Sequence, residues 1–338
     1  MKKYLAILLV SLLAVTMFAG CKNKAETDKE TEAKTVKTGL AVITSQAKSA
    51  DAGEADGFAQ VDSAVVALTL DSSGKIIKCV IDSAQSKILF NTQGQLVTPM
   101  DTLFETKNEL GDTYNMKRAS GIGKEWYEQA AAFASYVEGK TVSEVKGIAV
   151  DAENHPTGSD LVSSVTMSVG DYVAAIEKAA SNAKDYGASS SDKLSLGVYT
   201  TMGHSKGAGD EDGLAEAYST YVAVTTDTAG KITSCIIDAT QGNVRFDSSG
   251  NITSDTAAPI QTKNEKGDAY GMKIASGIGK EWYEQAAAFA EYVSGKTFGE
   301  AASITVDEKE VPTDSDLRAS VTIGIGDFKA ALAKAAGA

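Results

Sequence analysis

One half of this chain repeats the other half. Shifting the numbering by 156 places residues near 40–180 on their counterparts without a gap, and residues 119–134 and 275–290 both read ASGIGKEWYEQAAAFA. Each unit has about 140 residues, a common size for a domain with its own core. Two long units favour tandem domains over a solenoid, which needs shorter and more numerous repeats. We therefore expect repeat 1 over 38–181, a linker over 182–193 and repeat 2 over 194–338.

The first part of each repeat has the pattern of a β-hairpin. In repeat 1, segments rich in β-branched residues at 64–70 and 75–82 flank a turn at 71–74 that ends in glycine. A glycine at that place can adopt the left-handed conformation that such turns need. A second turn of the same kind is expected at 91–94.

The second part of each repeat is predicted to be mainly helical. An alanine-rich helix is expected over 124–137, and a capping box of Thr141 and Glu144 begins another short helix. A strand over 161–169 then precedes an amphipathic helix that begins at Asp171. The predicted fold class is therefore α+β, with two tandem repeats that are each a curved antiparallel sheet packed by helices.

The N-terminus has the three parts of a signal peptide. Two lysines precede an apolar run over 4–18, and the small residues Ala19 and Gly20 come directly before Cys21. The run is shorter than the roughly 20 residues of a spanning helix. The end resembles a bacterial lipobox, so residues 1–20 are predicted to be removed and Cys21 to be lipidated. The alternative is an ordinary secretory signal with a chance cysteine.

The segment after the signal peptide is predicted to be a lipid-anchored, disordered tether over residues 21–37. It has one large apolar residue after Cys21, namely Val36, which is too little to offset the entropy of ordering the chain. The whole chain carries a net charge of −13, which repels phosphate backbones and excludes nucleic acid as a partner. The expected location is the outer, extracellular face of the cell membrane.

Several common catalytic and metal-binding motifs are absent from the sequence. There is no Walker A, HExxH or CxxC pattern, and neither catalytic residues nor metal ligands are predicted. The two histidines, His155 and His204, are not counterparts in the duplication. Cys79 and Cys235 are counterparts inside apolar runs, which favours two equivalent buried thiols over a disulfide.

A threonine ends the most informative repeated segment, Asp160–Thr166 in repeat 1 and Asp316–Thr322 in repeat 2. Apolar residues alternate over 165–169, so the intervening Thr166 is expected to point away from the core. Such a hydroxyl is accessible to a modifying enzyme, and the upstream aspartate could position it or hold a divalent metal during transfer. The simpler alternative is a solvent-facing threonine on an edge strand.

These segments resemble the acceptor motif of the FMN-binding domain family, in which FMN is joined through its phosphate to a threonine. The family pattern is Asp, two variable residues, Ser/Thr, Gly/Ser, Ala/Val and Ser/Thr. Repeat 2 departs from it with Ala319 at the first Ser/Thr position. The resemblance assigns these residues to cofactor binding: Asp160, Ser163 and Thr166 in repeat 1, and Asp316, Ser320 and Thr322 in repeat 2.

A wider resemblance covers both repeats, the tether and the lipobox. Residues 262–273 and 277–285 look like the domain pair of extracellular flavin lipoproteins, including the peptide pheromone-encoding lipoprotein A type. This implies that a flavin transferase uses FAD and Mg²⁺ to attach up to two covalent FMN groups. It also implies electron transfer from a membrane NADH dehydrogenase and quinone to extracellular acceptors such as ferric iron. The chain is then an electron carrier more than a turnover enzyme.

Aromatic and basic residues in both repeats are candidates for contact with the flavin. Each has two interpretations, because Trp, Tyr and Met are also ordinary core residues. The glycines in 121–123 could likewise cradle a phosphate or only form the turn before a helix. The candidates are Tyr114, Met116, Lys117, Trp126 and Tyr127 in repeat 1, and Tyr270, Met272, Lys273, Trp282 and Tyr283 in repeat 2.

Two other functions remain open from the sequence. One is non-covalent capture of a small molecule in a cleft between the repeats. The other is a pheromone precursor, in which the signal peptide preceding Cys21 is the active product.

Overall fold

The computed structural model describes residues 34–338, and all of these belong to one compact unit. The predicted signal peptide over 1–20, Cys21 and most of the tether lie outside the described residues. The last four residues of the predicted tether are part of the fold. Val36 is buried, its N–H donates to the Ala188 carbonyl over 3.0 Å, and the first strand begins at Lys37.

Each repeat forms a three-stranded antiparallel sheet with the strands in sequence order. Helices follow each sheet, so the α+β class and the two tandem repeats are confirmed. Repeat 1 contains β1 (Lys37–Ser45), β2 (Gly57–Leu70), β3 (Ile76–Phe90), α1 (Lys107–Leu110), η1 (Gly111–Tyr114), α2 (Trp126–Val137), α3 (Val142–Lys146) and α4 (Gly170–Asn182). Repeat 2 contains β4 (Lys193–Thr201), β5 (Gly213–Thr226), β6 (Ile232–Phe246), α5 (Lys263–Lys266), η2 (Gly267–Tyr270), α6 (Trp282–Val293), α7 (Phe298–Ala302), α8 (Ser315–Arg318) and α9 (Gly326–Gly337).

The two predicted turns and the predicted start of α3 lie where the sequence placed them. Gly74 and Gly94 end their turns with φ of 80° and 65°, a conformation that favours glycine. Thr141 and Glu144 form the expected capping box at the start of α3. The helix expected from residue 124 begins two residues later, because Glu125 is its N-cap.

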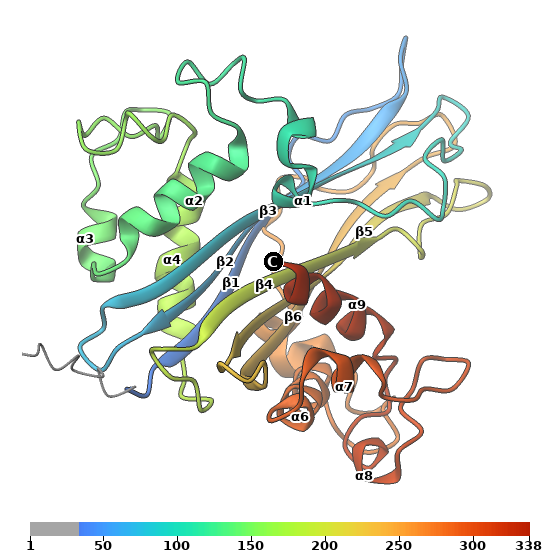
Figure 1. Cartoon of the computed structure of the whole chain (residues 1–338). Coiled ribbons are helices and arrows are strands. Elements are labelled where there is room, and N and C mark those ends of the chain that lie inside the picture. Colours follow the sequence, from blue (N-terminus) through green and yellow to red (C-terminus); the bar gives the residue numbers. More distant parts are fainter. Residues whose placement is uncertain (1–33) are drawn as a thin grey trace, which may run out of the picture. The chain divides into compact units, whose positions relative to one another are not determined.

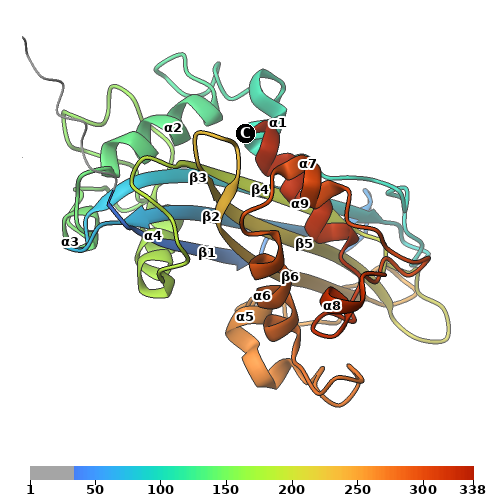
Figure 2. The same ribbon diagram turned by 60° about the horizontal axis from the view of Figure 1, so that its bottom comes forward.

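The sheets pack against each other, and the helices cover their outer faces (Figures 1 and 2). Along β2, Val66 belongs to the core beneath α2 and α4, whereas its neighbour Val65 packs against Tyr221 of β5. Both faces of the central strands are therefore buried. This explains why the run over 64–68 is continuously apolar instead of alternating with polar residues.

The two repeats contact each other through equivalent residues in both directions. Phe90 stacks on its counterpart Phe246, with ring centroids 4.1 Å apart and planes inclined by 2°. Such reciprocal contacts are those of a two-fold dimer interface, here formed within one chain. The equivalent ion pairs across the interface are Lys178–Glu265 and Lys334–Glu109.

Candidate cofactor attachment site

The strand predicted over 161–169 does not form, and both threonines lie in loops. In repeat 2 the start of the segment belongs to α8. In repeat 1 the chain turns at Gly158–Leu161, where the Leu161 N–H donates to the Gly158 carbonyl over 3.0 Å. Val165, Met167 and Val169 are nevertheless buried, so the predicted alternation of buried apolar residues is present without a strand. The backbone of this segment bonds to a helix side chain instead of a neighbouring strand, and alternation alone does not distinguish these cases.

The hydroxyl of Thr166 is held between a loop and helix α2. Its Oγ1 donates to the Ser120 carbonyl over 2.8 Å and lies 3.2 Å from Gln129 Oε1. Thr322 has the same two distances, 2.8 Å to the Ser276 carbonyl and 3.2 Å to Gln285 Oε1. Both threonines are partly exposed. The two repeats therefore present their hydroxyl groups in one geometry.

Gln129 fixes the threonine loop in repeat 1. Its Oε1 accepts hydrogen bonds from the N–H groups of Thr166 and Met167, and its Nε2 donates to the Lys124 carbonyl. The side chain is completely buried, as is its counterpart Gln285 in repeat 2. Sequence reasoning missed both residues. The available signal was a glutamine on the apolar face of a helix that is identical in both repeats.

A buried carboxyl group lies at the start of α2 and orders the preceding loop. Glu125, 3% exposed, accepts hydrogen bonds from the N–H groups of Met116 and Lys117 over 2.7 and 3.1 Å. Because this position already holds an acidic group, the glycines over 121–123 are better explained as a turn before the helix than as a phosphate cradle. The Lys117 side chain points into solvent, as does Lys273 in repeat 2.

The other motif residues lie on the surface near the turn. Asp160 is exposed, and its Oδ2 accepts a hydrogen bond from Tyr136 Oη over 2.7 Å, which raises the pKa of Tyr136. Asp316 is exposed on α8. Ser163 is exposed and Ser320 is half-buried. Asp160 therefore bonds to a tyrosine instead of to Thr166.

A cavity of about 440 Å³ opens beside the threonine loop of repeat 1. Its wall includes Met167 and Ser168, the two residues that follow Thr166. The size lies within the range of small-molecule sites, which are mostly apolar with a few polar groups. The structure thus brings three of the five repeat 1 candidates together here: Tyr114, Met116 and Trp126. Tyr127 does not line this cavity, and its hydroxyl donates to Asp112 Oδ1 over 3.2 Å.

Charged residues in this cavity were not anticipated from the sequence. Lys107 lies with its Nζ 4.8 Å from the Tyr114 ring centroid and 5.4 Å from that of Trp126. Asp62 faces the same space and accepts hydrogen bonds from Lys48 and Gln85. Burial raises the pKa of Asp62, but the hydrogen bonds outweigh this effect and leave the pKa below its usual value.

The corresponding space in repeat 2 is filled by its own side chains. Tyr218 replaces Asp62, and its hydroxyl accepts a 2.7 Å hydrogen bond from Lys263, the counterpart of Lys107. Lys263 is only 4% exposed, and its Nζ lies between 4.5 and 4.9 Å from three ring centroids. Burial lowers the pKa of Lys263 to about 8. The three rings are those of Tyr218, Tyr270 and Trp282.

Two further cavities lie along the junction of the repeats. One, of about 460 Å³, includes Asp238 and Lys178, and the other, of about 360 Å³, includes their counterparts Asp82 and Lys334. Burial raises the pKa of both aspartates to about 6. The junction therefore offers a pair of related hollows, which is the place that the alternative of non-covalent capture assigns to its ligand.

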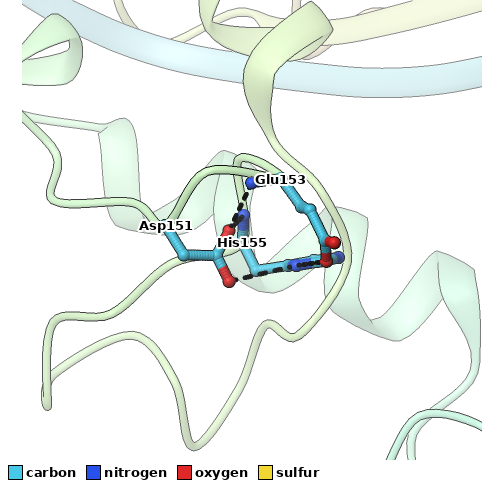
Figure 3. Close-up of side chains that lie close together, drawn as sticks. All are labelled: Asp151, Glu153 and His155. Atoms are coloured by element: carbon cyan, nitrogen blue, oxygen red, sulfur yellow. Dashed lines mark hydrogen bonds and ion pairs between the residues drawn. The ribbon is translucent and has the colours of Figure 1, made fainter.

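Asp151, Glu153 and His155 form a surface cluster whose possible ligand atoms lie within 4.8 Å of one another (Figure 3). Asp151 Oδ1 accepts hydrogen bonds from the backbone N–H groups of Glu153 and His155, as expected for a turn that begins with aspartate. Asp307 forms the same turn in repeat 2 with Lys309 and Val311. The turn itself explains why these side chains meet.

The two cysteines that the structure describes are buried free thiols, as predicted from their duplicated positions. Burial raises the pKa of Cys79, and raises that of Cys235 to about 12, so neither thiol is a reactive nucleophile at neutral pH. Among the residues from 34 onward, no helix has the length and apolar character needed to cross a membrane.

Comparison with known proteins yields one short match. A stretch of 40 residues is 55% identical to part of a protein named chlorophenol reductase from Desulfitobacterium hafniense. The match spans 12% of this chain and 12% of that protein, which is too little to show a shared family. No protein-family profile and no solved structure matches the chain.

Proposed function

We propose that this protein is a lipid-anchored electron carrier with FMN joined covalently to Thr166 and Thr322. The observation that carries the proposal is the repeated arrangement of each threonine, with the same Ser and Gln partners at the same distances. Each hydroxyl is held at a fixed place and is partly exposed, as an attachment point for a covalent group requires. The wall of aromatic residues beside Thr166 supports a planar ligand at this place.

Attachment requires a transferase that uses FAD. The threonine oxygen forms a bond to the phosphorus of the FMN half, the pyrophosphate bond breaks, AMP leaves, and the hydroxyl proton passes to a base. Within this chain, Gln129 and the Ser120 carbonyl hold the hydroxyl and its loop in place. The bound flavin supplies the redox chemistry, while the protein supplies attachment and surroundings.

The same proposal includes the partners and location implied by the resemblance. A membrane NADH dehydrogenase and quinone reduce the carrier, which passes electrons to extracellular acceptors such as ferric iron. Lipidation of Cys21 holds it at the outer face of the membrane. Labelling with a palmitate analogue tests the anchor: the label should be present in the wild type and absent after Cys21→Ser.

Intact-mass measurement after coexpression with a flavin transferase tests the attachment. The wild type should gain the mass of FMN minus water at two sites, Thr166→Ala and Thr322→Ala should each gain one, and the double variant none. The exposed pair Thr157→Ala and Thr313→Ala is the matched control and should still gain two. A bare chain in the wild type would contradict the proposal.

A second candidate is non-covalent capture of a small molecule, which the two cavities at the junction favour. In that case a ligand purified with the protein is released by denaturation and leaves the chain mass unchanged. A pheromone role for the signal peptide is separate, and detection of that peptide in culture medium tests it.

A further inference from the structure

We infer that the two repeats hold their flavin rings differently: repeat 1 buries its ring in the cavity beside Thr166, whereas Tyr218 and Lys263 keep the ring of repeat 2 outside. This inference rests on the proposed flavin attachment. It concerns residues that differ between otherwise matching repeats. The threonine geometry itself is the same in both.

Repeat 1 has space and suitable surfaces for a flat ring system. The cavity of about 440 Å³ begins at Met167 and Ser168, directly after the attachment residue. Tyr114 and Trp126 supply aromatic surfaces, and aromatic rings gain energy by stacking or edge contacts beyond the area that they bury. Asp62 stays at the wall because Lys48 holds it over 2.8 Å. A ring tethered at Thr166 therefore has a preformed site within reach.

Repeat 2 uses the same space for an internal contact. The Tyr218 ring replaces the small Asp62 side chain at the matching position of the strand, since Asp62 pairs with Gln85 and Tyr218 with Gln241. Lys263 closes the site further by donating to Tyr218 Oη while lying beside three rings. A flavin ring could enter only by displacing a buried lysine from these contacts. Its resting place is therefore the surface.

The position of Tyr218 is itself stabilised by its neighbours. His204 lies edge-on to the Tyr218 ring, with centroids 6.0 Å apart, and its Nδ1 lies 2.7 Å from Glu216 Oε1. Glu216 is buried. Repeat 1 has Lys48 and Gln60 at these two positions, so the whole set differs and not only one residue.

Quenching of flavin fluorescence by iodide measures the difference. Thr322→Ala carries flavin only on repeat 1, and Thr166→Ala carries it only on repeat 2. Small-molecule pockets bury 70–90% of ligand surface, so the repeat 1 flavin should be quenched about three- to tenfold less efficiently. Asp62→Tyr should remove this protection in the first variant, and Tyr218→Ala should create protection in the second. Circular dichroism checks that each variant is folded.

A second measurement uses the unmodified double variant, Thr166→Ala/Thr322→Ala, with free riboflavin as the probe. A tether of this kind gives the ring an effective concentration of about 1 mM, so the cavity must bind riboflavin at or below that level. Asp62→Tyr should weaken binding at least about tenfold, equal to about 1.4 kcal/mol.

The results that would overturn the inference about the ring sites differ from those that would overturn the proposed flavin attachment. Equal quenching of the two attached flavins, or no riboflavin binding up to about 1 mM, overturns the inference about the ring sites. A chain that carries no covalent flavin after coexpression overturns the proposed function, while the riboflavin measurement still decides whether the cavity accepts the ring.

Discussion

Asp62 in repeat 1 and Tyr218 in repeat 2 occupy the same strand position, yet one borders a cavity and the other fills it. In the threonine loops, by contrast, Thr166 and Thr322 keep their hydrogen-bond partners and distances unchanged. The duplication has therefore preserved the attachment geometry while altering the adjoining wall. Geometry that serves a shared task is expected to be retained, whereas a neighbouring surface is free to specialise.

The largest expected effect on stability is at the interface between the repeats, where two equivalent rings can be removed one at a time. Phe90→Ala and Phe246→Ala each remove one ring of the central stack, and buried Phe→Ala changes cost about 3–5 kcal/mol. Because the rings are related by the approximate two-fold axis, we expect the two losses to agree. Urea denaturation followed by circular dichroism measures them. A difference greater than about 2 kcal/mol would show that the repeats are supported unequally.

Removal of the glutamine amide tests whether the threonine loops are equivalent. Gln129→Met leaves the N–H groups of Thr166 and Met167 without their partner, which should cost about 2–4 kcal/mol. It should also abolish flavin attachment in repeat 1 only. Gln285→Met should abolish flavin attachment in repeat 2 only. The control is Gln93→Met at an exposed position, which should leave attachment in both repeats unchanged. Loss of flavin from both repeats after either change would contradict independent sites.

The buried lysine predicts a pH dependence that belongs to repeat 2. The pKa of Lys263 is about 8 in the folded state against an ordinary value of 10.5, so the unfolded chain binds more protons between these values. Stability should therefore rise from pH 8 to 10.5 by about 1–3 kcal/mol. Lys263→Met should remove this rise, as measured by urea denaturation across that range. Lys107→Met, at a half-buried position, is the matched control.

The smallest expected effects are at the motif aspartates. Asp160→Asn and Asp316→Asn alter exposed side chains, so stability should change by less than about 0.5 kcal/mol. The larger of the two losses should come from Asp160, which bonds to Tyr136. If these aspartates position the hydroxyl or a metal during transfer, the rate of flavin attachment should fall in both. Unchanged rates would limit their role to the turn.

Sequence reasoning was most reliable where local chemistry alone decides the structure. The turn ending in Gly74 and the capping box of Thr141 and Glu144 depend on residues next to each other in the chain. The loop over 161–169 was mistaken for a strand, because its partner, Gln129, is distant in sequence. Lys107 was missed as part of the site for the same reason: only the fold brings it beside Trp126.

The reciprocal interface has a consequence for behaviour at low concentration. A dimer held by the contacts of Phe90 and the two ion pairs separates into subunits when it is diluted, since its stability depends on subunit concentration. Here both partners belong to one polypeptide, and joining them replaces a bimolecular encounter with an intramolecular one. The paired arrangement therefore persists for a single isolated molecule.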